Sequence, residues 1–69
     1  MKINYEEFNE LQTQQTIRNY AQETINILNC LNNIIDEEKQ NKKIMEMMNE
    51  VRAIEDEAVE NIRKMIEGD

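Results

Sequence analysis

One stretch of eight consecutive residues, Asp36 to Lys43, contains no apolar side chain, whereas apolar residues recur at helical spacing on either side of it. Two amphipathic helices folded back on each other around a solvated tip have this pattern. The sequence therefore predicts an all-α fold built on an antiparallel two-helix hairpin. A single helical rod of ~80 Å is the alternative, but it would lose every core position for two turns.

The N-terminal part of the chain carries its own helix signals. Asn4 followed by Glu7 is the capping-box pattern that begins a helix. Phe8 and Leu11 point away from the apolar stripe that follows, and the wholly polar run Gln12–Thr16 lies between the two. We therefore expect a break near Thr13 that separates a short first helix, at about residues 4–12, from the hairpin. A continuous helix with its first turns facing another neighbour is the alternative.

The remaining boundaries follow from apolar spacing within a single domain, residues 1–69. The main helix of the hairpin is expected at about residues 15–36, the tip at 36–43, and the second long helix at about 41–67, with a start near Glu37 as the alternative. Asp36 or Asn41 is expected to cap that second helix. Gly68 stands where a residue after a helix end is commonly glycine.

The chain is short for a stable core. It has 69 residues, and its 4% aromatic content leaves the core to aliphatic side chains and methionine. A domain of this size buries only about 60% of the surface of its unfolded chain, and a single cysteine offers no internal disulfide. We therefore expect a homo-oligomer, a dimer or a larger helical bundle. The expected interface is the stripe of the first long helix, Ile17, Ala21, Thr24, Leu28, Leu31 and Ile35.

Composition narrows the functional classes. The chain has no histidine and one glycine, which argues against a catalytic site, a zinc site or a glycine-rich phosphate loop. No cofactor is expected. The net charge of −7 argues against direct nucleic-acid binding, and short apolar runs argue against a membrane segment. A lone cysteine and five methionines favour a cytoplasmic location.

The second long helix carries a row of acids on its outward side, Glu46, Glu50, Glu57 and Glu60. Spaced negative charge on a rigid helix can imitate a nucleic-acid backbone and occupy a basic groove. Our first hypothesis is an acidic interaction protein whose partner has a basic surface. A solvated helix face looks similar and is the plainer interpretation. Arg63 is expected to pair with Glu67.

A different class of function is a sponge for a nucleotide-type signal molecule. The first long helix carries a row of neutral amides, which includes Asn19, Gln22 and Asn26. Tyr20 and the tip lysines Lys39, Lys42 and Lys43 would complete the ligand site, because helix N-termini favour anions. Genome composition on an exposed face, and lysines placed for solubility, are the competing interpretations.

A short leader and two antiparallel helices resemble the small helical-hairpin proteins that phages use against bacterial defence, and the stretch Val51–Ala58, leading to Ile62 and Ile66, is similar to the second helix of their cyclic-nucleotide sponges. That resemblance implies an oligomeric hairpin that either sequesters cyclic nucleotides or inhibits a defence enzyme in the host cytoplasm. The second helix departs from the sponge type in lacking an aromatic residue that could stack on a base. A purely structural coiled-coil oligomer is the third hypothesis.

Overall fold

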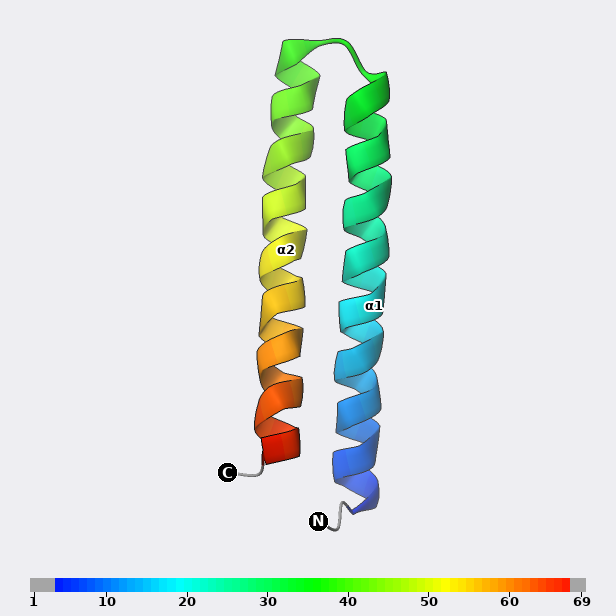
Figure 1. Ribbon diagram of the computed structural model, residues 1–69, viewed down its shortest axis with the longest axis vertical. Helices are drawn as coiled ribbons and strands as arrows, with labels where there is room; N and C mark the ends of the chain where they lie inside the picture. Colours follow the sequence, from blue (N-terminus) through cyan, green and yellow to red (C-terminus); the bar gives the residue numbers. More distant parts are fainter. Residues whose placement is uncertain (1–3, 68–69) are drawn as a thin grey trace.

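The computed structural model describes residues 4–67 and consists of two antiparallel helices, α1 (Tyr5–Ile34) and α2 (Glu38–Glu67). The two helices run side by side over nearly their whole length, so the start of α1 and the end of α2 lie at the same end of the molecule (Figure 1). The molecule measures 51 × 16 × 13 Å. The described residues contain no strand. The all-α hairpin expected from the sequence is confirmed.

The capping box at the start of α1 is also confirmed. The Asn4 side-chain oxygen accepts a hydrogen bond from the Glu7 backbone N–H at 2.7 Å, and the Asn4 amide nitrogen donates to the Glu7 carboxylate at 3.0 Å. This exchange satisfies one of the backbone N–H groups that a helix start leaves without a partner. Glu6 and Glu7 lie in the first turn, where negative charge complements the helix dipole.

The expected break near Thr13 is wrong, because α1 is one helix from Tyr5 to Ile34. The polar run contains no proline or glycine, and glutamine is a good helix former. The hydroxyls of Thr13 and Thr16 donate to backbone carbonyls four residues earlier, at 3.0 and 2.9 Å, within the helix. Phe8 stays 48% exposed and Leu11 is half-buried, so the helix continues although not all of its early apolar residues are covered.

The tip is shorter than the sequence indicated. Ile35 adopts an extended backbone and donates its N–H to the carbonyl of Leu31 at 3.0 Å, which ends α1. After residues 35–37, α2 begins at Glu38, and the Asn41 N–H donates to the Glu37 carbonyl at 2.9 Å. Neither residue expected to cap α2 occupies the position before its first helical residue. The predicted glycine stop at Gly68 lies outside the described residues.

The lysines expected in a loop belong to the first turns of α2. The run from Glu38 to Lys43 has no helix breaker, and Glu38 places a negative charge at the positive end of the helix dipole. These residues therefore extend the helix, although they contribute no large apolar side chain to its contact with α1. The sequence could not distinguish a solvated loop from a solvated helix start.

The contact between the helices has coiled-coil spacing on α2. The residues turned toward α1 recur at alternating steps of three and four: Asn41, Ile44, Met48, Val51, Glu55, Ala58, Ile62 and Met65. On α1 the facing side includes Ala21, which is buried, and the half-buried Ile25 and Leu28. Five residues of the described chain are buried, two of them alanines, and no large side chain among them is fully enclosed. The core of one hairpin is therefore thin.

Candidate functional site

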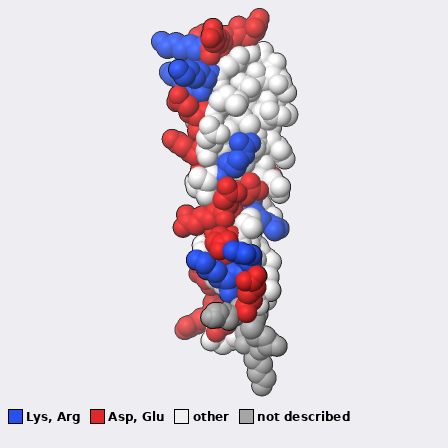
Figure 2. Space-filling model, turned by 60° about the vertical axis from the view of Figure 1, so that its left-hand side comes forward, with Lys and Arg blue, Asp and Glu red and all other residues white. Residues whose placement is uncertain are grey.

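The acidic face of α2, defined as Glu46, Glu50, Glu57 and Glu60, lies along the side of that helix away from α1. The first three residues are exposed, and Glu60 is half-buried. Figure 2 shows acidic groups standing out along one edge of the molecule and a broad uncharged area in the half near the tip. By the rise of an α-helix, the row spans roughly 20 Å. The exposed position expected from the sequence holds for three of the four carboxylates.

Glu60 differs from the other three because it is paired. The Arg63 guanidinium donates to both Glu60 carboxylate oxygens, at 2.7 and 2.9 Å, so the expected pairing with Glu67 is wrong. The hydrogen bond from Arg63 lowers the pKa of Glu60 below its ordinary value. Within residues 4–67, the side chains of Glu46, Glu50 and Glu57 make no hydrogen bond or ion pair with the protein. Within the acidic face, these three carboxylates are therefore available to a partner.

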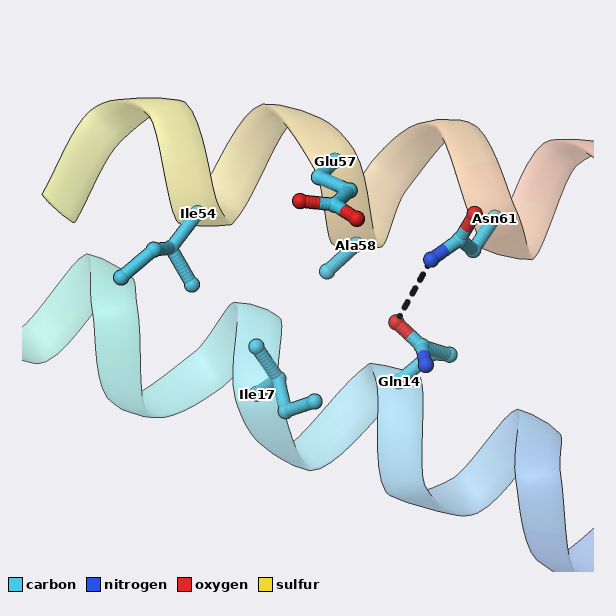
Figure 3. A pocket seen from close by; sticks show the side chains of 6 residues that line it. All are labelled: Gln14, Ile17, Ile54, Glu57, Ala58 and Asn61. Carbon is cyan, nitrogen blue, oxygen red and sulfur yellow. Dashed lines mark hydrogen bonds between the residues drawn. The ribbon is translucent and has the colours of Figure 1, made fainter. Parts of the chain in front are cut away.

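A small pocket of about 180 Å³ opens between the helices toward the chain ends. In Figure 3, Gln14 and Ile17 of α1 face Ile54, Ala58 and Asn61 of α2. The Asn61 side-chain nitrogen donates to the Gln14 side-chain oxygen at 3.2 Å. Glu57 of the acidic face lines the same pocket, so the inner edge of that face meets the helix contact.

Sequence reasoning missed this amide pair. Gln14 had been assigned to the polar run that was expected to break the helix. Its position seven residues before Ala21, and fourteen before Leu28, was the available signal, because that interval returns a residue to the same face of a packed helix.

The six residues expected to form an interface between copies fall into two groups, those covered within one hairpin and those exposed on its surface. Ala21 is buried, and Ile17 and Leu28 are half-buried, on the side of α1 that packs on α2; Ile35, which follows α1, is also half-buried. Thr24 and Leu31 are exposed. Four of the six residues therefore contribute first to packing within one chain, while two lie on its surface.

The residues assigned to a nucleotide do not converge within one hairpin. All seven, Asn19, Tyr20, Gln22, Asn26, Lys39, Lys42 and Lys43, are exposed. Tyr20 lines a shallow groove beside Ile54 of α2, whereas Lys39 stands in the first turn of α2 at the tip. The helical rise puts roughly 20 Å between these two levels of the hairpin. A single ligand-binding cavity that contains both groups is not formed by one chain.

No group of three or more histidine, cysteine, aspartate or glutamate side chains in residues 4–67 is arranged to hold a metal ion. Neither helix, over the described part of the chain, combines the length and hydropathy needed to span a bilayer. No protein-family model matches the chain, and no curated protein or solved structure matches it.

Proposed function

We propose that this chain is a non-catalytic interaction protein that uses the acidic face of α2 to occupy a basic surface on a protein partner. The observation that carries the proposal is the row of outward carboxylates, of which Glu46, Glu50 and Glu57 lack an ion pair within the described chain. Carboxylates that are not neutralised by their own protein keep their full attraction for cations on another.

The shape of the hairpin supports this function. The helix backbone holds the carboxylates on one straight, rigid element, so little backbone entropy is lost when they bind. Glu46 and Glu50 are separated along the axis by ~6 Å, from the helical rise, a spacing on the scale of successive phosphates in a nucleic-acid strand. Basic grooves that bind nucleic acid are therefore the natural target. Some of the phage anti-defence hairpins that the chain resembles are acidic inhibitors of a defence enzyme, which favours a host defence factor as the partner class.

The test compares two charge-matched triple variants. One changes Glu46, Glu50 and Glu57 to Gln, and its control changes Glu6, Glu10 and Glu23 of α1 to Gln. Each removes three negative charges from the net charge of −7, so a difference between them reports the position of the charge. The tagged proteins are used to capture partners from a host extract, and each partner is then purified for titration.

We expect the wild type and the α1 variant to bind the same basic protein, and the α2 variant to lose at least tenfold in affinity. Binding should weaken as salt rises, because ions screen exposed charges, and duplex DNA should compete. An equal loss of affinity in both variants would show that binding depends on net charge and not on the position of the acidic face. Unchanged binding by the α2 variant would remove the acidic face as the site.

A further inference from the structure

A row of large apolar side chains remains on the surface of α1 beside its contact with α2. We call Tyr20, Ile27, Leu31 and Ile34 the apolar strip. They are 66%, 67%, 40% and 78% exposed, and with Thr24 between the first two they recur at steps of four, three, four and three. That spacing is typical of a second coiled-coil seam, and the hairpin itself leaves the seam uncovered.

The apolar surface continues from the strip onto α2. Tyr20 and Thr24 line a shallow groove together with Val51 and Ile54 of α2, so the strip and that part of α2 lie on the same side of the hairpin. Ile54 is 51% exposed. An uncovered face that crosses from one helix to the other is wide enough to receive a helix in the groove between them.

The solvent-accessible surface area of the hairpin is larger than that of a typical folded monomer of its mass. The hairpin exposes 5581 Å², whereas a typical folded monomer of 8.3 kDa exposes roughly 4,600 Å² by the scaling of surface with mass. The excess of roughly 1,000 Å² is comparable with the contribution of each partner to a standard protein–protein interface, about 800 Å². One further chain of this size on this face would bring the exposed area to the usual value.

Charge and spacing identify that chain as a second copy. Two molecules with a net charge of −7 repel each other, so a surface without carboxylates is the most favourable place for them to associate. No position of the apolar strip is charged. A second copy also has the same seam spacing, so the side chains of the two strips can interdigitate along their length.

We propose that two hairpins pack through the apolar strip into a four-helix dimer. Tyr20, Ile27, Leu31 and Ile34 are then covered by the partner copy, and the outward side of α2 stays accessible. Four-helix bundles gain their core in this way, from seams that single hairpins leave open. The dimer neither requires nor excludes the acidic-face function, so the two proposals are tested separately.

The experiment compares two lysine substitutions in the full chain. Ile27→Lys disrupts the strip, and Val59→Lys changes a 44% exposed residue of α2 that lies roughly 140° around the helix from Ile54 at 100° per residue. Each new lysine follows a glutamate by four residues, Glu23 or Glu55, so the two substitutions have similar effects on the helix itself. Light scattering gives the native mass, and circular dichroism gives the melting temperature against protein concentration.

We expect the wild type and Val59→Lys to have twice the chain mass of 8.3 kDa and a melting temperature that rises with concentration. Ile27→Lys should have the mass of one chain and, whether folded or not, no such concentration dependence. A wild type with the mass of one chain would overturn the proposal and leave the strip to a different protein. A dimeric Ile27→Lys, or loss of the dimer in both variants, would also overturn it.

Discussion

The Asn61 side-chain nitrogen donates a hydrogen bond to the Gln14 side-chain oxygen at 3.2 Å, across forty-seven residues of sequence. It is a direct hydrogen bond between side-chain amides of α1 and α2, in a contact that is otherwise mostly apolar (Figure 3). Both residues are half-buried. If one of them is removed, water therefore does not fully replace the hydrogen bond that the other loses. This bond aligns the helices at the end of the hairpin that has no connecting loop.

Removing one member of the pair should therefore destabilise the hairpin. We expect Asn61→Ala to lower the free energy of unfolding by about 1 kcal/mol, because Gln14 keeps a half-buried oxygen without its donor. The double variant Gln14→Leu/Asn61→Leu should recover most of that loss, because no amide is then left without a partner. Urea unfolding at fixed protein concentration measures both changes.

The control for this experiment is Asn26→Ala on the exposed side of α1. It reports the gain in helix propensity that any Asn→Ala change brings, so the effect of Asn61→Ala is taken relative to it. If Asn61→Ala stabilises the protein as much as Asn26→Ala does, the bond across the helices contributes nothing measurable.

The close approach of the helices depends on small side chains. Ala58 is 1% exposed in the contact between the helices, so a larger side chain there must displace its neighbours. We expect Ala58→Leu to lower the free energy of unfolding by about 2 kcal/mol through overpacking. Ala53→Leu on the exposed side of α2 is the matched control and should change it little. Equal thermal stability of the two variants would contradict the described contact.

Local signals in the sequence predicted the start of α1 and the hairpin. The Asn4–Glu7 exchange depends on residues three apart, which any chain with that pattern can form. The alternating spacing from Ile44 to Met65 identifies the inner side of α2, because an apolar stripe must be covered. The break at Thr13 was wrong because it was inferred from two apolar stripes that do not line up and from the polar run between them. In the structure Phe8 is half-exposed, and Gln14 takes the facing position instead.

Part of the candidate site could also be predicted from local spacing in the sequence. The helical period identifies the outward positions of α2, so the exposure of Glu46, Glu50 and Glu57 could be predicted from the sequence. The partner of Arg63 was not, because Glu60 and Glu67 are both within reach along the helix and spacing does not choose between them. Which part of the α1 stripe is used within one chain depends on the rotation of α1 against α2, a tertiary property that no local pattern specifies.

The Glu60–Arg63 pair makes a pH-dependent contribution to stability. The hydrogen bond from Arg63 lowers the pKa of Glu60 in the folded protein, so the folded state binds this proton less readily than the unfolded state. The contribution is therefore present above the unfolded pKa of Glu60 and is lost as the pH falls through its folded pKa. We expect Arg63→Gln to melt slightly lower than the wild type at neutral pH, because the pair is largely exposed.

This difference should disappear in acid, where Glu60 is protonated in both proteins, and should shrink in high salt. NMR titration of the Glu60 side chain gives the direct measurement, and the pKa should rise when Arg63 is replaced. Arg52→Gln is the control, because Arg52 also lies on α2 but donates to Asn49 and not to Glu60. A Glu60 pKa that Arg63→Gln leaves unchanged would show that the pair does not form in solution, and Glu60 would then be as available to a partner as Glu57.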